Sequence, residues 1–343
     1  MKHLLNTLYI LSEDIYLSLD GENVVANRDK QAVARYPLHT LQNIITFSYA
    51  GASPALMGAC AQRQVGLAFC TPRGKFLARV CGEGNGNVLL RRTQYRIADD
   101  PGQCCRISRT MIFGKLFNAR WSMERTRRDH GLRVDSEKLA AASQQIYGLL
   151  PQVKEATSLE GLRGLEGVGA SAYFGVFNEM ILGGQETFSF RGRSRRPPMD
   201  AVNAMLSFAY SLLAHDCASA LEGVGLDSYV GFLHRDRPGR TSLALDLMEE
   251  LRPCMADRFV LTLINTHQVS PSDFLYMESG AVLLTDDGRK AFLKHWQEKK
   301  KETLTHPYLG EKLPWGMIPY IQALLLARHL RGDLDAYPPF LWK

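Results

Sequence analysis

Short runs of β-branched and other apolar residues dominate the first part of the chain, with polar turns such as Asp20-Gly21 between them. Runs of this kind are typical of strands that pack one face on a core. Residues 54–64 differ, because they have the length and composition of a single helix. The pattern therefore predicts a small β-rich domain with strands over residues 8–11, 15–19, 24–26, 33–36, 41–47, 65–70 and 76–80.

The pattern changes near the sequence GEGNG at residues 82–86. Beyond it, apolar residues recur every three or four positions, which is the period of an amphipathic helix. We therefore expect an α+β multi-domain fold, with a β-rich domain over residues 1–84 and a larger, all-helical domain over residues 85–343. The helices are predicted over residues 87–97, 103–118, 120–129, 136–148, 158–182, 200–221, 241–251, 287–302 and 313–331.

The composition is that of an ordinary globular protein, with 45% hydrophobic and 22% charged residues among 343. No apolar run is long enough for a membrane span, and the N-terminus lacks the cleavage site of a signal peptide. The seven cysteines show neither a CxxC pair nor the spacing of a zinc site, so we expect reduced, buried thiols. These features favour a protein of the prokaryotic cytoplasm.

Positive charge is concentrated rather than spread. The formal net charge is +6, but residues 91–133 hold eleven Lys and Arg against four Asp and Glu, an excess of seven. Such a surplus favours binding to a polyanion such as DNA, although a helical surface laced with salt bridges explains it equally well. The basic loop RGRSRRPP at residues 191–198 supplies four further candidates for phosphate contacts, namely Arg191, Arg193, Arg195 and Arg196.

Candidate chemistry is densest between residues 231 and 253. His234 precedes a basic turn, RDRPGR, and a helix follows in which leucines recur at intervals of four. At about 100° per residue, Asp246 and Glu249 lie opposite those leucines and one turn apart. One interpretation is a solvated helix face, and the other is a site that combines an imidazole with two carboxylates.

A second informative stretch is the helix predicted over residues 158–182, which contains five glycines, at positions 161, 164, 167, 169 and 175. Each glycine costs a helix about 1 kcal/mol relative to alanine, so we expect another backbone or a ligand to approach closely. Glu166 stands in the middle of this stretch. Close packing would bring its carboxylate beside His234.

Five segments together resemble one protein family: LRGLEGVGASAYF, DAVNAMLSFAYSLL, GLDSYVGFLH, GRTSLALDLMEELRP and RGDLDAYPPFLW. The family is the CRISPR-associated integrase and endonuclease of the adaptation module (Cas one), and the resemblance is to its type I-C branch over essentially the whole chain. It implies a homodimer formed through the N-terminal domain, and a complex with the Cas two protein that captures double-stranded DNA. It leaves open whether a Cas four nuclease acts alongside.

The resemblance also implies a metal site. It maps the metal-binding residues of the family on Glu166, His234 and Glu249, with Asp246 three residues before the last. Many relatives carry Asp at the final position, so which of Asp246 and Glu249 binds the metal stays open. Carboxylates with one imidazole suit Mg²⁺ or Mn²⁺.

In the family, a DNA 3′-OH attacks a phosphodiester at the edge of the CRISPR repeat and thereby inserts a spacer. Arg235, Arg237 and Arg240 lie beside His234 in the sequence and are candidates for holding phosphates, and Tyr173 is a further candidate for substrate contact. Two other functions remain possible on the residues alone. One is a hydrolytic DNA nuclease that uses the same metal site, and the other is a non-catalytic DNA-binding scaffold.

Overall fold

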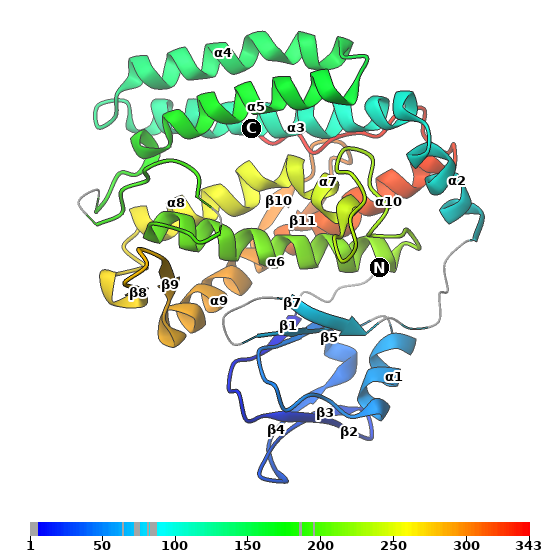
Figure 1. Cartoon of the computed structure of the whole chain (residues 1–343). Coiled ribbons are helices and arrows are strands. Elements are labelled where there is room, and N and C mark those ends of the chain that lie inside the picture. Colours follow the sequence, from blue (N-terminus) through cyan, green and yellow to red (C-terminus); the bar gives the residue numbers. More distant parts are fainter. Residues whose placement is uncertain are drawn as a thin grey trace. The chain divides into compact units, whose positions relative to one another are not determined.

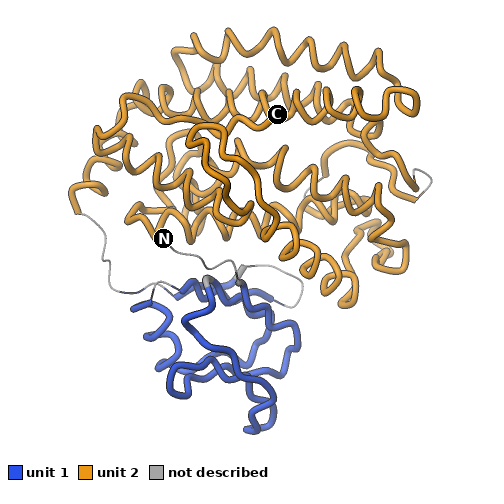
Figure 2. The backbone as a smooth tube through the Cα atoms, turned by 180° about the vertical axis from the view of Figure 1, so that it is seen from behind, with its two compact units in different colours: residues 1–85 blue, residues 86–343 orange. Residues whose placement is uncertain are grey.

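The computed structural model describes residues 6–63, 65–71, 76–80, 82, 88–184, 187–194 and 196–343. The chain forms two compact units, Met1–Asn85 and Gly86–Lys343, which are coloured separately in Figure 2. The division lies one residue after the boundary that the sequence pattern predicts. Each unit has its own core and is described by itself.

Two sheets form the described part of the first unit. One sheet has the strand order β1 (Asn6–Ile10), β5 (Leu41–Thr46), β6 (Gly66–Cys70), β7 (Phe76–Val80), parallel except for the β6–β7 pair. The other is an antiparallel meander of β2 (Tyr16–Asp20), β3 (Asn23–Arg28) and β4 (Gln31–Pro37). Helix α1 (Pro54–Gln62) begins at Ser53, whose hydroxyl accepts a hydrogen bond from the backbone of Leu56.

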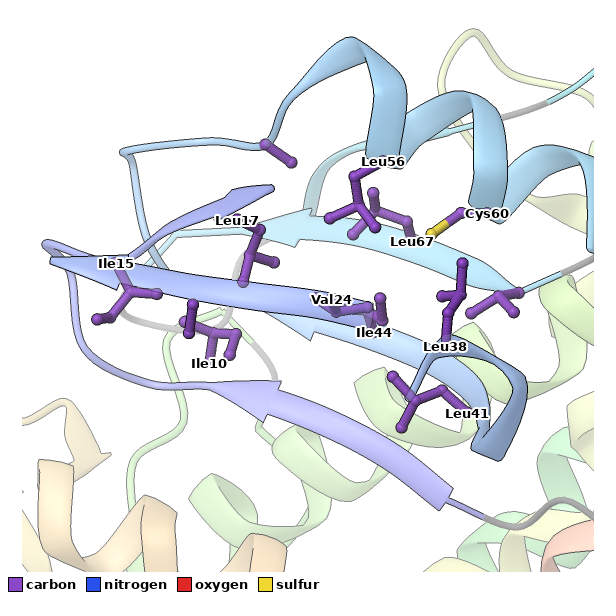
Figure 3. Packing of buried hydrophobic residues seen from close by; sticks show 13 residues of the cluster. Ile10, Ile15, Leu17, Val24, Leu38, Leu41, Ile44, Leu56, Cys60 and Leu67 are labelled. Carbon is purple, nitrogen blue, oxygen red and sulfur yellow. The ribbon is translucent and has the colours of Figure 1, made fainter. Parts of the chain in front are cut away.

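The core of this unit lies between the two sheets and α1 (Figure 3). Leu17 and Val24 from the meander, Ile44 and Leu67 from the other sheet, and Leu56 from α1 are at most 1% exposed. The strands predicted from the sequence are present within one or two residues at most ends, because alternation of apolar and polar positions identifies a strand with one buried face.

The second unit is mostly helical but not all-helical, so that prediction was wrong in part. Two antiparallel pairs occur in it, β8 (Phe274–Tyr276) with β9 (Val282–Leu284) and β10 (Thr303–Thr305) with β11 (Lys312–Pro314). Strands of three residues are too short to show an alternating pattern. The principal helices are α2 (Val88–Ala98), α3 (Pro101–His130), α4 (Ser136–Glu155), α5 (Leu159–Gly175), α6 (Ala201–Gly223), α7 (Ser242–Leu251), α8 (Arg258–Asn265), α9 (Asp286–Lys301) and α10 (Ile318–Leu330).

Helix α3 is one continuous helix where the sequence pattern predicted two. It packs against α4, α5 and α7, and Figure 1 shows α3, α4 and α5 side by side. Asn118 interrupts the apolar periodicity because its side chain is buried and bonded. Its amide donates to the backbone oxygens of Glu250 and Phe340, at 2.7 and 2.8 Å.

Helix α7 runs into a π-helical segment, Arg252–Asp257, and then into α8. Pro253 accounts for the irregularity, since it has no N–H to donate and its ring crowds the carbonyl four residues earlier. The sequence pattern ended the helix at this point and did not predict α8. The segment carries Arg252 alongside the last turn of α7.

Two predictions from composition can be compared with the described residues. None of the helices described is long and apolar enough to cross a membrane. The six cysteines within the described ranges are buried free thiols, as expected, and Cys81 lies outside those ranges.

Candidate metal centre

Both acids that the sequence places opposite the leucines of α7 are buried. Asp246 is 0% and Glu249 is 4% exposed, and within α7 only Leu245 is not buried. The interpretation of this helix as a solvated face is therefore wrong. A carboxylate removed from water must be compensated by hydrogen bonds or by opposite charge, and the partners of the two acids differ.

Asp246 uses both carboxylate oxygens on the loop that carries His234. Its Oδ2 accepts the backbone N–H groups of Phe232 and Leu233, at 2.6 and 2.9 Å. Its Oδ1 accepts the backbone N–H of His234 at 3.0 Å and contacts Nδ1 of the same residue at 2.5 Å. A neutral imidazole that donates its Nδ1–H here presents the Nε2 lone pair outward. Asp246 thus fixes the loop and the orientation of the imidazole.

Glu249 lies among cations. Its Oε1 is 3.1 Å from Nη1 of Arg252 and 3.8 Å from Nε2 of His234, and its Oε2 is 2.7 Å from Nζ of Lys115. Burial alone would raise the pKa of Glu249, but the charges of Arg252, Lys115 and His234 outweigh it and lower the pKa to about 2. The carboxylate is ionised at neutral pH.

Glu166 reaches the same cluster from α5. Its Oε1 forms a short ion pair with Nζ of Lys115, so one ammonium contacts both glutamates. The packing of α5 on α3 produces this approach at Gly169, where an added Cβ would overlap the side chain of Leu116. Gly164 and Gly167 have no such neighbour within 4 Å. Close packing therefore explains one glycine of this surface, and the helix beside Glu166 stays open.

The donor set suits a hard divalent cation, because two carboxylates and one imidazole nitrogen face one another. The Oε2 of Glu249 supports this fit. It is buried, and the ion pair with Lys115 is too oblique to count as a hydrogen bond, so no donor satisfies this oxygen. Among the described side chains, however, no three His, Cys, Asp or Glu residues are already arranged to hold a metal ion. The ammonium of Lys115 lies between the two glutamates instead.

Lys115 and Arg252 were missed by the sequence reasoning. Lys115 lies on α3, 51 residues before Glu166 and 134 before Glu249, and no local pattern links these positions. Arg252 follows the acidic pair directly and could have been suspected on helical spacing, since it lies three residues after Glu249.

The predicted phosphate contacts divide into exposed and internal groups. Arg235 and Arg237 are exposed, and Arg240 is half-buried beside them. Burial, together with the charge of Arg237, lowers the pKa of Arg240. Arg191 and Arg196 are also exposed, whereas Arg195 lies outside the described residues.

Arg193 and Tyr173 have internal partners instead. The guanidinium of Arg193 donates to Oδ1 of Asn203 at 2.6 Å and lies over the ring of Tyr210. Tyr173 is 3% exposed, and its ring packs edge-on against Phe174 and Phe177. In this structure both residues belong to the protein interior, so direct contact with DNA would require local opening.

Residues 8–298 match the protein family described as CRISPR associated protein Cas1. The chain is 48% identical over 343 residues to the CRISPR-associated endonuclease Cas1 1 of Chlorobaculum tepidum, with all of both chains covered. The chain belongs to the Cas1 family. It is also 50% identical over 347 residues to CRISPR-associated endonuclease Cas1 2 of Rhodospirillum rubrum, again over the full length of both. The family resemblance inferred from the sequence is confirmed at this level.

A third relative is a fusion of a Cas4 exonuclease with a Cas1 endonuclease from Geobacter sulfurreducens. It is 35% identical over 337 residues, which are 97% of this chain and 60% of the fusion. Among solved structures, a casposase bound to its integration product matches with a TM-score of 0.83 at 22% identity, over 98% of this chain and 94% of that one.

A complex named Cas6-RT-Cas1–Cas2 matches with a TM-score of 0.78 at 20% identity, over 98% of this chain and 36% of that one. At these identities the structural likeness concerns the fold. It confirms the predicted combination of a β-rich N-terminal part with a largely helical C-terminal part.

Proposed function

We propose that this Cas1 protein is a metal-dependent DNA integrase that inserts spacers into a CRISPR array. The observation that carries the proposal is the buried carboxylate of Glu249, which lies 3.8 Å from Nε2 of His234 and shares the Lys115 ammonium with Glu166. Three residues from distant parts of the sequence thereby meet at one position. The two fully covered relatives are named as endonucleases, which supports DNA as the substrate.

In this proposal Glu166, Glu249 and Nε2 of His234 hold the metal, which is Mg²⁺ or Mn²⁺. The bound metal would polarise a phosphoryl oxygen and favour deprotonation of an attacking hydroxyl. Asp246 does not bind the metal, since both its oxygens already accept hydrogen bonds from the loop. Its role is to hold His234 with Nε2 toward Glu249.

The reaction that we propose is a transesterification. The 3′-oxygen of the incoming DNA forms a bond to a phosphorus of the repeat, and the bond from that phosphorus to the 3′-oxygen of the repeat strand breaks. Arg235 and Arg237, exposed beside His234, would hold the phosphates on either side. With water in place of the 3′-OH, the same site would only hydrolyse DNA.

The remaining parts of the proposal concern assembly. We infer that the chain works as a homodimer formed through its β-rich unit, and with Cas2, in the prokaryotic cytoplasm where its DNA lies. The fold likeness to a chain of a Cas6-RT-Cas1–Cas2 complex supports Cas2 as a partner, and the natural Cas4/Cas1 fusion supports cooperation with a Cas4 nuclease. The assignment to type I-C is a proposal of the same kind and rests on the sequence segments given above.

A strand-transfer assay tests the function. Labelled double-stranded DNA with free 3′-OH ends is incubated with a supercoiled plasmid that carries a CRISPR repeat, with Cas2 and Mn²⁺. We expect the label to become covalently joined to the plasmid, and we expect Glu166→Gln to abolish joining. Glu160→Gln, on the exposed first turn of the same helix, is the matched control.

Plasmid cutting without joined label would favour the hydrolytic nuclease. Joining that persists in both Glu166→Gln and Glu249→Gln would refute the proposed site. DNA binding with neither cutting nor joining would favour the non-catalytic scaffold.

A further inference from the structure

The ammonium of Lys115 occupies the space between the two glutamates of the candidate metal site. Its Nζ lies 2.7 Å from Oε2 of Glu249 and forms a shorter ion pair with Oε1 of Glu166. The Lys115 side chain is only 12% exposed. A cation that contacts both carboxylates lies where a divalent ion would have to bind in order to be coordinated by both.

The charges of the cluster balance without any metal. Glu166 and Glu249 contribute two negative charges, and Lys115 and Arg252 contribute two positive ones. The pairing lets two carboxylates lie close together in a partly buried site, where they would otherwise repel each other. A divalent ion added while both cations remained would leave the cluster with a net charge of two.

The two cations are held differently. The guanidinium of Arg252 is buried, lies over the ring of Tyr210 at 5.0 Å and contacts the other oxygen of Glu249, Oε1. It is fixed by the π-helical segment and leaves Oε2 accessible. Lys115 ends a flexible four-carbon stem, and its contacts in the cluster are to the two carboxylates that a metal would use.

We propose that Lys115 is a tethered counter-cation of the metal site, which holds Glu166 and Glu249 in place before metal binding and is displaced by the divalent ion. The inference rests on the proposed metal site. It makes Lys115 a positioning residue, and it explains why the acids and the imidazole of this centre are not yet arranged as a ligand group in the described part of the chain.

The consequence is a competition that can be measured without catalysis. Every metal that binds must remove the ammonium from both carboxylates, so the lysine lowers the apparent metal affinity. Without metal, the lysine stabilises the fold by neutralising the carboxylates. Removal of its charge should therefore strengthen metal binding and weaken the metal-free protein.

The test compares the full-length wild type with Lys115→Met, which keeps the length of the side chain, and Lys115→Arg, which keeps the charge. Mn²⁺ binding is measured by electron paramagnetic resonance of the free ion and by calorimetry, and Tm is measured with and without Mn²⁺. Lys138→Met is the matched control, because Lys138 pairs with Glu179 away from the cluster. Circular dichroism establishes that each variant is folded.

We expect Lys115→Met to bind Mn²⁺ at least ten-fold more tightly than the wild type, to melt at a lower temperature without metal, and to gain more Tm from Mn²⁺. Lys115→Arg and Lys138→Met should show no gain in affinity. Detectable binding in Lys115→Met alone would also support the proposal.

Equal or weaker binding in folded Lys115→Met, with clear binding in the wild type, would refute the counter-cation role and leave the metal site intact. The absence of binding in every protein would refute the metal site itself, and the inference with it.

Discussion

Replacing Asp246 with Asn tests the division of labour between the two acids of α7. In the wild type, Oδ2 of Asp246 accepts two backbone N–H groups, and Oδ1 accepts a third and contacts Nδ1 of His234. An asparagine has only one oxygen. When that oxygen serves Phe232 and Leu233, its NH₂ group faces the backbone N–H of His234, donor against donor.

The structure sets the size of two effects. One charge-assisted hydrogen bond is lost, worth about 1.5–3 kcal/mol, and one buried N–H is left unsatisfied, at a cost of about 1–3 kcal/mol. We therefore expect the free energy of unfolding to fall by about 2–4 kcal/mol. The NH₂ group can donate to Nδ1 of His234 only when the ring proton is on Nε2, and a protonated Nε2 cannot bind metal. Loss of such an orienting group typically weakens metal binding about 10–100-fold.

Calorimetric titration with Mn²⁺ measures the second effect, and urea unfolding measures the first. The comparison variant is Glu249→Gln, which removes a proposed ligand and should abolish measurable binding. An Asp246→Asn protein that binds Mn²⁺ within two-fold of the wild type would refute the orienting role. If instead Asp246→Asn abolished binding and Glu249→Gln only weakened it, the two acids would have to exchange roles.

Three further predictions follow from the structure. Replacing Arg235 and Arg237 with Gln should weaken DNA binding and lower the slope of log K against log salt by about 2, whereas Arg193→Gln should destabilise the fold and leave that slope unchanged; equal slopes in all variants would contradict the exposed loop as a DNA contact. Burial raises the pKa of Glu250 from 4.5 to about 7. The folded state therefore binds the extra proton, and the free energy of unfolding should fall by about 3 kcal/mol as the pH rises from 4.5 to 7. In Glu250→Gln most of this decline, followed by thermal melting at each pH, should vanish. Gly169→Ala should cost about 1–3 kcal/mol in urea unfolding, because the added Cβ meets Leu116, and a neutral result would mean that α3 and α5 can separate without loss.

The strands of the first unit and most helices of the second were predictable because their apolar residues follow a clear period. The exceptions have physical causes. Asn118 breaks the pattern of α3 because its buried amide is satisfied by backbone oxygens from distant segments. The three-residue strands β8 to β11 are too short for any period to emerge.

The candidate site was only partly predictable, for a different reason. The spacing of Asp246 and Glu249 placed them on one helix face, but their roles depend on what packs against that face. The loop at His234 reaches Asp246, and Lys115 of α3 reaches Glu249. Lys115 itself gave no signal, since contacts across 51 and 134 residues leave no trace in local spacing.

The most direct test of the central claim is anomalous diffraction at the manganese edge from crystals grown with Mn²⁺. We predict one strong peak about 2 Å from the carboxylate oxygens of Glu166 and Glu249 and from Nε2 of His234. Asp246 should remain bonded to its loop, outside that coordination sphere. A peak coordinated by Asp246, or a manganese ion bound elsewhere while these three side chains stay without metal, would contradict the proposed metal site.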